Sequence, residues 1–279
     1  MNKKLLFTAA LMLLGGHLLA KPIAFSEPVL LLKSSQNLMA PVWSPDGSKI
    51  AVTGDNYVGI WVANADGSSL QQVSSATGAG YQMIWSDAHN ITSTPYTYVG
   101  QKRMTRIENV DVANGQIKLI ADAERNVQRS KAINAPSVLK IMVDDPSNAT
   151  ARIAALNRYQ GKMVINPALS PDGSKIAFQV VSKGMFVCNA DGSNLISLGK
   201  GSHASWLPDN KSIMMTKIED NGAVFTSSDI YCVNVETGEQ VNITPSTEVI
   251  PVTIAVSPDG SKVAFDNDSD GCIYLINLK

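Results

Sequence analysis

The stretch WSPDGSKIAVTGDNYVGIWVANADGSSLQQVS, residues 43–74, decides the fold. Its Ser-Pro-Asp-Gly sequence at 44–47 is typical of a turn, because proline fixes the φ angle of the second position and glycine ends the turn. Short apolar segments follow at 49–52 and 60–64, and Ala-Asp-Gly at 65–67 leads into a third segment. This pattern predicts short antiparallel strands joined by tight turns.

The same pattern recurs along the chain. Close copies begin at Leu169 (LSPDGSKIAFQVVSKGMFVCNADGSNLISLG) and at Val256 (VSPDGSKVAFDNDSDGCIYLINLK). Weaker copies begin at Trp85 and Trp206. No long helical periodicity appears after the first twenty residues, so the recurring unit indicates an all-β protein.

The spacing of these copies predicts the number of repeats. Trp43 and Trp85 are 42 residues apart, and Trp43 and Leu169 are 126 apart, which is three times 42. One degenerate repeat is therefore expected to start near Val127. Six repeats of about 43 residues each are typical of four-stranded propeller blades. We predict a six-bladed β-propeller of four-stranded blades.

The two ends of the repeat region complement each other. The last repeat stops after three strands, and Pro28–Lys33 has the character of an outer strand without a blade of its own. Pairing of Pro28–Lys33 with Ile273–Leu278 would complete the last blade and leave neither terminal blade with an unpaired edge. We predict that an N-terminal strand closes the ring in this way.

The first twenty residues, MNKKLLFTAALMLLGGHLLA, have the pattern of a secretory signal peptide. Lys3 and Lys4 precede an apolar run, and Ala20 offers a small residue for cleavage. The alternative is an uncleaved membrane anchor, but the run is shorter than the roughly 20 residues that span a bilayer. We predict a signal peptide at 1–20, a propeller at 21–279 without a membrane span, and a periplasmic or secreted location.

Composition excludes some classes of function. The chain has 279 residues, with 23 Lys and Arg against 24 Asp and Glu, a net charge of −1. Without a basic excess, binding of nucleic acid through bulk electrostatics is not expected. The 44% of hydrophobic residues is too high for a disordered chain.

Antiparallel alternation assigns the connections to two faces of the propeller. The Ser-Pro-Asp-Gly and Asn-Ala-Asp-Gly turns share one face, which we call the turn face. The loops between second and third strands and those between repeats share the other, which we call the loop face. Loops of variable length on a rigid scaffold are the usual place for binding, so the loop face and the adjoining channel mouth are the predicted binding surface.

The longest well-placed insertion on the loop face after that of the repeat at Trp206 is residues 95–106. It offers Tyr96, Tyr98, Lys102 and Arg103, and aromatic and arginine side chains are enriched at protein interfaces. We take these four as candidate partner-binding residues. The alternative is a solvated extension of a hairpin.

A second candidate on the loop face is Asp-Asn-Asp-Ser-Asp-Gly at 266–271. Asp266, Asp268 and Asp270 have the spacing of a calcium loop, and three carboxylates at alternate positions can converge on one hard cation. Asn277 stands where a bidentate glutamate completes such loops. The prediction is weak calcium binding, and the alternative is an ordinary polar loop.

Signatures of catalysis are missing from the full sequence, which contains no G-x-S-x-G or H-E-x-x-H motif. His203 is expected at the channel mouth, where it joins the partner-binding candidates, whereas His89 is expected on the turn face. Cys188, Cys232 and Cys272 lack the spacing of a disulfide framework and are predicted to be buried free thiols.

The repeats resemble the TolB-like β-propeller repeat, whose blades carry W-S-P-D-G-x-x-I-A-F followed by a stretch similar to I-Y-x-x-N/D-x-x-G-G. The first motif is matched at 43–52, 169–178 and 256–265, and the second at 229–238 and 272–277. The resemblance implies a non-enzymatic envelope protein that docks other proteins. The N-terminal α/β domain of that family has no counterpart in the roughly 20 residues between the leader and Trp43, so docking that depends on it is not carried over.

Two functions remain open from the sequence. The first is a non-catalytic, monomeric interaction scaffold in the periplasm that binds an envelope protein and needs no cofactor. The alternative is a propeller that binds a glycan or a peptide at the channel mouth, with hydrolase or lyase activity as a variant of it.

Overall fold

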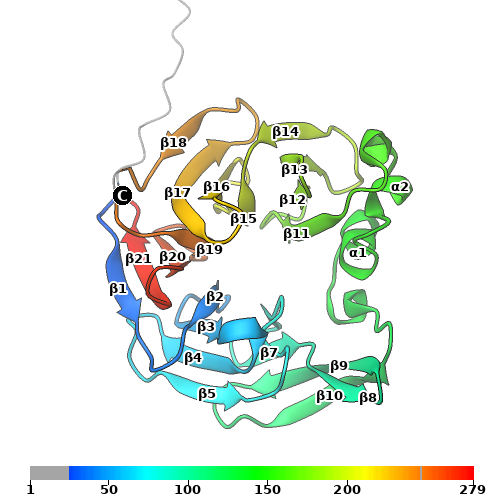
Figure 1. The fold of residues 1–279 in the computed structure, drawn as a ribbon, viewed down its shortest axis with the longest axis vertical. Helices are drawn as coiled ribbons and strands as arrows, with labels where there is room; N and C mark the ends of the chain where they lie inside the picture. Colours follow the sequence, from blue (N-terminus) through cyan, green and yellow to red (C-terminus); the bar gives the residue numbers. More distant parts are fainter. Residues whose placement is uncertain (1–24, 246) are drawn as a thin grey trace, which may run out of the picture.

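The structure of residues 25–245 and 247–279 is a computed structural model, and the predicted signal peptide at 1–20 lies outside these described residues. Within them, five antiparallel sheets stand around a common axis (Figure 1). Four sheets have four strands and one has five. The predicted β-propeller is confirmed, whereas the prediction of six blades is wrong.

Each blade begins with an inner strand beside the axis and continues outward (Figure 1). The first and second blades consist of β2 (Met39–Trp43), β3 (Lys49–Thr53), β4 (Ile60–Asn64) and β5 (Gln71–Ser74), then β6 (Ile84–Trp85), β7 (Asn90–Ser93), β8 (Tyr96–Val99), β9 (Lys102–Asp111) and β10 (Ile117–Glu124). The third and fourth consist of β11 (Val164–Leu169), β12 (Lys175–Val180), β13 (Gly184–Asn189) and β14 (Ile196–Gly199), then β15 (Ser202–Trp206), β16 (Ser212–Asp220), β17 (Phe225–Asn234) and β18 (Gln240–Asn242). The fifth consists of β19 (Pro251–Val256), β20 (Lys262–Asn267), β21 (Cys272–Asn277) and β1 (Val29–Leu32).

A helical segment takes the place of the expected blade near Val127. Between β10 and β11 the chain forms only short helices, which occupy the side of the ring between the second and third blades (Figure 1). They are the 3-10 helix η2 (Arg129–Ala132), α1 (Ser137–Asp144), α2 (Ala149–Arg152) and the 3-10 helix η3 (Ala154–Tyr159). We call residues 125–163 the helical segment.

The reason for this difference lies in the sequence of the helical segment. It contains neither of the two turn motifs that define the other repeats. Val138, Leu139 and Met142 fall on one side of α1, a helical spacing, and are buried against the third blade. The number of residues between Trp85 and Leu169 is therefore large enough for a further blade, but the chain fills this side of the ring with short helices instead of strands.

The predicted closure of the ring is confirmed. β1 pairs antiparallel with β21, with Val29 opposite Leu275 and Leu32 opposite Ile273. The Ser26 N–H also donates a hydrogen bond of 2.9 Å to the Asn277 carbonyl. The N-terminal strand thus covers the edge that β21 would otherwise expose.

Indole groups fasten neighbouring blades to each other. Trp43 donates through Nε1 to the carbonyl of Ala255 in the fifth blade at 3.1 Å. The indoles of Trp85 and Trp206 make the same kind of bond to the inner strand of the preceding blade, at 3.0 and 2.9 Å. These bonds lie beside the apolar clusters between adjacent sheets.

The Ser-Pro-Asp-Gly turns hold themselves together through their aspartates. Asp46 accepts a hydrogen bond of 2.6 Å from the Ser44 hydroxyl and one of 3.1 Å from the Ser48 N–H. Asp172 and Asp259 do the same in their own turns. These aspartates therefore serve the turns in which they lie.

Candidate functional site

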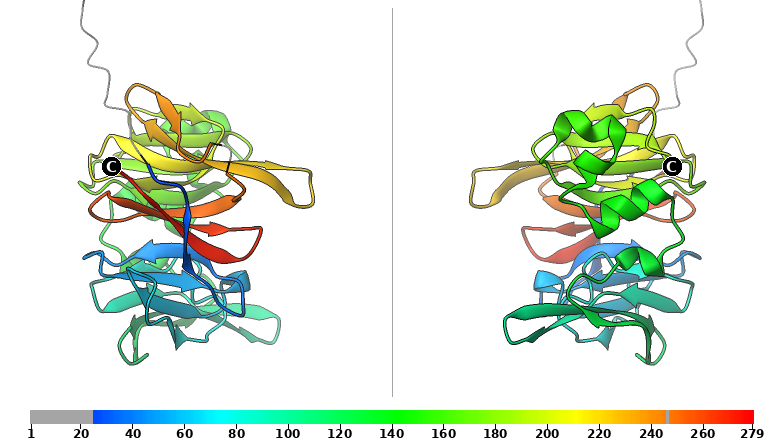
Figure 2. Two further views of the ribbon diagram at one scale, coloured as in Figure 1. Left: turned by 90° about the vertical axis from the view of Figure 1, so that its left-hand side faces the viewer. Right: turned by 90° about the vertical axis from the view of Figure 1, so that its right-hand side faces the viewer.

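Exposed apolar side chains gather on the loop face. Among the described residues, eight of the exposed large hydrophobic side chains lie in loops or hairpin ends of this face, and none lies in a Ser-Pro-Asp-Gly turn. The eight are Val58, Tyr81, Tyr98, Val99, Met163, Val181, Val224 and Phe225. Figure 2 shows the β16–β17 hairpin projecting from one side of the disc. The loop face therefore carries most of these exposed side chains among the described residues, and the other six lie on β1, β6 and β10.

The predicted insertion at 95–106 is a hairpin of β8 and β9. Gly100 has a φ of 61°, which a two-residue turn with glycine first requires, and Val99 pairs with Lys102 across it. The rings of Tyr96 and Tyr98 meet edge to face with centroids 5.8 Å apart. The Arg103 guanidinium lies 3.8 Å from the centre of the Tyr96 ring, a cation–π contact.

The loop before β6 supports this hairpin. The Tyr96 N–H donates to the Thr77 carbonyl at 3.0 Å. A Cβ on Gly78 would come within 2.6 Å of the Tyr96 ring, so only glycine allows this packing. The same loop carries Tyr81, whose ring meets that of Tyr57 edge to face at 5.0 Å.

Arg129 reaches this loop from the helical segment. Its guanidinium donates to the side-chain oxygen of Gln82 and to the carbonyls of Gln82 and Tyr81, at 3.2 and 3.4 Å for the carbonyls. It also lies 5.2 Å from the centre of the Tyr81 ring. Burial lowers the pKa of Arg129, and the nearby charge of Arg103 acts in the same direction.

These side chains form one group that we call the Tyr–Arg cluster: Tyr57, Tyr81, Tyr96, Tyr98, Arg103 and Arg129. The sequence pointed to Tyr96, Tyr98 and Arg103, which the structure brings together. It missed the other three, which come from different loops. A signal was available for Tyr57 and Tyr81, since both lie in loops that alternation assigns to the loop face.

The other two partner-binding candidates lie apart from the cluster. Lys102 is exposed at the hairpin end, and because it pairs with Val99 it points to the side opposite Tyr98 and Arg103. His203 is on β15, the inner strand of the fourth blade, with its Nδ1 buried and without a hydrogen-bond partner. Burial lowers its pKa to about 4, so the imidazole is neutral at pH 7.

The backbone at His203 has a structural explanation. Its φ of 51° is left-handed, and Ala40 of β2 and Asn166 of β11 have φ angles of 50° and 51°. In all three inner strands the register shifts at that point, as in a β-bulge. The unusual angle is therefore a shared feature of inner strands.

The three aspartates of the candidate calcium loop have separate environments. Asp266 is buried and accepts hydrogen bonds from the Thr253 N–H and hydroxyl, both at 2.6 Å, and from the Ala40 N–H at 3.0 Å. Burial raises its pKa. Asp270 accepts from the Cys272 N–H at 3.0 Å and the Tyr274 hydroxyl at 2.8 Å. Across the part of the chain that the structure describes, no three acidic, histidine or cysteine side chains form a group that could hold a metal ion.

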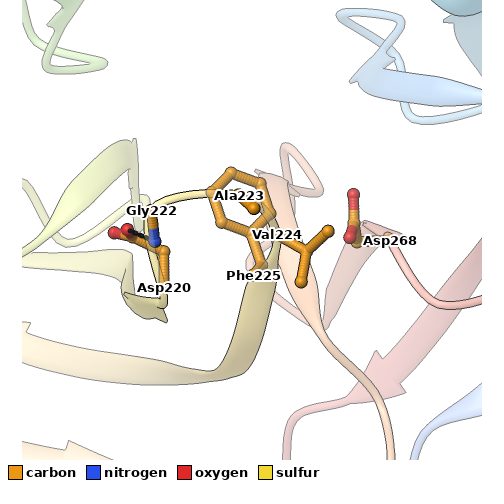
Figure 3. A pocket seen from close by; sticks show the side chains of 6 residues that line it. All are labelled: Asp220, Gly222, Ala223, Val224, Phe225 and Asp268. Carbon is orange, nitrogen blue, oxygen red and sulfur yellow. Dashed lines mark hydrogen bonds between the residues drawn. The ribbon is translucent and has the colours of Figure 1, made fainter.

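Asp268 instead borders a cavity of about 330 Å³ at the end of the β16–β17 hairpin. In Figure 3, Asp220 and Asp268 lie on opposite sides of Val224 and Phe225. A second hollow, of about 280 Å³, lies at the turn-face ends of three inner strands, where it includes Trp206 and the prolines of three turns. The first belongs to the loop face and the second to the turn face.

The cysteines are buried free thiols, as predicted. Burial raises the pKa of Cys188 to about 12 and that of Cys232 to about 11. Thiols with such pKa values are protonated at neutral pH and are poor nucleophiles.

Among the described residues, no helix has the length and apolar character needed to cross a membrane.

Comparison with known proteins shows the fold. No protein-family model and no curated protein matches this chain. The β-propeller domain of Cps50 from Myceliophteria thermophila aligns with 92% of this chain and 100% of that chain, at a TM-score of 0.54 and 10% identity. At so low an identity the likeness shows a shared β-propeller fold and nothing about activity.

Two further solved structures align at lower TM-scores. TolB from Acinetobacter baumannii aligns with 89% of this chain at a TM-score of 0.41 and 14% identity. An oligogalacturonate lyase in complex with manganese aligns with 87% at a TM-score of 0.34 and 15% identity. This chain covers 56% of that TolB chain and 63% of that lyase chain, less than two thirds of either.

Proposed function

We propose that this chain is a non-catalytic interaction module of the cell envelope that docks a protein partner on the Tyr–Arg cluster. The observation that carries the proposal is the convergence of four tyrosines and two arginines from three loops and the helical segment on the loop face. Tyr81, Tyr98 and Arg103 are exposed there, and the other three are partly buried. Tyr98 is 65% exposed and Tyr81 is 39% exposed, although both have large apolar rings.

The chemistry of the cluster suits binding. Tyrosine and arginine are the side chains most enriched at the energetic centres of protein interfaces, because they combine apolar area with hydrogen-bond donors. Contacts with neighbouring rings already limit their motion, so less conformational entropy is lost on binding.

The location is part of the proposal. The leader-like residues 1–20 favour export, and the resemblance of the repeats to TolB-like propellers favours the periplasm. We expect a monomer that acts as one member of an envelope complex.

A cross-linked affinity pull-down from a native envelope extract tests the proposal. The wild-type protein should capture a specific envelope protein, and a variant with Tyr96→Ala, Tyr98→Ala and Arg103→Ala should lose it. A turn-face variant, Asp209→Ala with Lys211→Ala, is the matched control and should keep the partner. Equal capture by all three proteins would contradict docking on the cluster.

A second candidate rests on the cavity between the β16–β17 hairpin and Asp268. Its two carboxylates and the Phe225 ring are groups that can bind a glycan or a peptide. Saturable binding to a panel of oligosaccharides and peptides, lost in Asp220→Asn with Asp268→Asn and kept in the cluster variant, would favour this function over the first.

A further inference from the structure

The β8 strand has one open edge. Its only paired neighbour among the described strands is β9. In the β8–β9 hairpin, Val99 pairs with Lys102 next to the turn, and the Arg106 N–H donates to the Pro95 carbonyl at 3.1 Å. Hydrogen-bonded pairs alternate along antiparallel strands, so the backbone groups of Tyr96 and Tyr98 point away from β9.

One of these outward groups is already used within the chain. The Tyr96 N–H donates to the Thr77 carbonyl at 3.0 Å, which confirms that this side of β8 accepts a neighbouring backbone. The next outward pair, the N–H and carbonyl of Tyr98, has no backbone partner among the described residues. An extended segment could form two hydrogen bonds with Tyr98, as a strand added to a sheet edge does.

Two arginine side chains, Arg103 and Arg129, belong to the cluster beside this edge. In the part of the chain that the structure describes, neither Arg103 nor Arg129 takes part in an ion pair. The oxygens of Asp144, an acid whose charge acts on Arg129, accept instead from the Ser130 N–H at 2.9 Å and the Ser130 hydroxyl at 2.5 Å. Two cations near each other, neither of them in an ion pair, favour an anionic ligand.

We infer that the partner of this protein adds an extended segment bearing aspartate or glutamate to the free edge of β8, so that its carboxylates meet the exposed Arg103; this inference rests on the proposed function. The charge of Arg129 is nearby. Backbone hydrogen bonds to Tyr98 supply the strand pairing. Alternate side chains of an extended segment point to one face, which places acidic residues on the face that carries Tyr96, Tyr98 and Arg103. Guanidinium groups bind carboxylates through paired hydrogen bonds, which makes recognition specific for acids.

The test uses labelled octapeptides with alternating residues and blocked ends. Fluorescence anisotropy with the purified protein should show binding of (Glu-Val)4 that is about tenfold tighter than binding of (Gln-Val)4. The acidic peptide should also lose about tenfold in affinity when its backbone nitrogens are methylated on one edge, because the N–H groups that pair with Tyr98 are then missing. Equal binding of the acidic and the amide peptides would overturn the inference.

Protein variants locate the contact. Arg103→Ala should weaken binding of (Glu-Val)4 about tenfold, and Tyr98→Pro, which removes the outward N–H, should weaken it to a similar extent. Lys211→Ala on the turn face removes a charge far from the edge and should change the affinity less than twofold. Unchanged affinity in both Arg103→Ala and Tyr98→Pro would contradict the inference, and the methylated peptide gives an independent reading if Tyr98→Pro folds poorly.

The pull-down separates this inference from the proposed function. If (Glu-Val)4 competes with the captured partner, both stand. If the partner is captured through the cluster but the acidic peptide neither binds nor competes, the proposed function stands and this inference fails. Binding of an oligosaccharide of uronic acids that depends on Arg103 but not on the Tyr98 N–H would overturn strand addition in favour of an acidic glycan.

Discussion

The two faces of the disc are built in different ways. On the turn face, three turns repeat one set of contacts, in which a serine hydroxyl donates to the aspartate two positions later at 2.6 to 2.7 Å. On the loop face the hairpins differ in length and content, and the exposed large apolar side chains of the loops are found there. The turn face repeats one type of hydrogen-bonded turn, whereas the loops of the other face differ in length and in sequence.

The difference shows which parts of the chain stabilise the fold and which are available for binding. A turn that satisfies its own polar groups needs no partner and offers little to one. Exposed aromatic rings and guanidinium groups outside ion pairs contribute little to folding, but they can form favourable contacts with a binding partner. Changes on the turn face should therefore alter stability, and changes on the loop face should alter binding.

The largest expected effect on stability comes from Asp266, a residue of the loop face that stabilises the fold. Asp266 stands at the loop-face end of β20, yet it connects the first and fifth blades through Ala40 and Thr253. Asp266→Ala would leave the Thr253 N–H without its acceptor and the Ala40 N–H with only the Thr253 hydroxyl, at 3.1 Å, and should lower the free energy of unfolding by about 2 kcal/mol. Urea denaturation measures this, with Asp268→Ala as the exposed control. A loss equal to that of the control would contradict the structural role of Asp266.

The next effect concerns the turn face. Replacing Asp46, Asp172 and Asp259 together by alanine removes the acceptors that fix three turns and should lower Tm by several degrees. Capture of the partner at a temperature below the transition should not change. Calorimetry and the pull-down measure the two quantities, and loss of the partner from the folded triple variant would move the binding surface to the turn face.

The pH dependence of stability should have opposite signs on the two faces. Hydrogen bonds from Ser44, Ser170 and Ser257 lower the pKa values of Asp46, Asp172 and Asp259 to about 2, below the unfolded value of about 3.9. Their contribution is present above about pH 4 and is lost as pH falls to about 2. Burial raises the pKa of Asp266, so the folded state holds that proton more tightly and its contribution weakens as pH rises above about 3.9.

Melting curves from pH 2 to pH 7 separate the two contributions. The triple variant with asparagine at the three turn positions should lose part of the fall in Tm between about pH 4 and pH 2. Asp266→Asn should flatten the opposite trend above about pH 4. Parallel Tm profiles for wild type and both variants would refute the assigned signs.

The smallest effect on stability belongs to the Tyr–Arg cluster. Tyr98→Ala with Arg103→Ala changes side chains at an exposed hairpin and should alter the free energy of unfolding by less than about 0.5 kcal/mol. The same variant should bind the partner at least tenfold more weakly, measured against wild type by anisotropy or calorimetry. A folded variant with full affinity would remove the cluster from the binding surface.

Local chemistry made much of the fold predictable. Turn residues and strand spacing depend on neighbours in sequence, so the turns, the blades and the pairing of the N-terminal strand with β21 followed from short stretches. The place of Tyr96, Tyr98 and Arg103 in one long insertion of the loop face followed in the same way. The missing sixth blade did not, because Val138, Leu139 and Met142 find their partners in another blade rather than in their own segment.

Contacts between segments distant in sequence also decided which residues of the candidate site could not be predicted. Arg129 joins the cluster only because the helical segment begins beside Gln82, a contact across 47 positions of sequence. Alternating aspartates in the candidate calcium loop indicate a metal in sequence, but Asp266 turns inward to Thr253 and Ala40. Whether calcium binds stays a prediction.

Site-specific photo-cross-linking in cells tests most directly whether the loop face is the docking surface. A photoreactive residue is placed at Thr97 on the β8–β9 hairpin and, in a second strain, at Ser68 beside a turn on the opposite face. A cross-link to one envelope protein from Thr97 and none from Ser68 is the predicted result, and Arg103→Ala should weaken it. A cross-link to the same protein from Ser68 alone would contradict docking on the loop face.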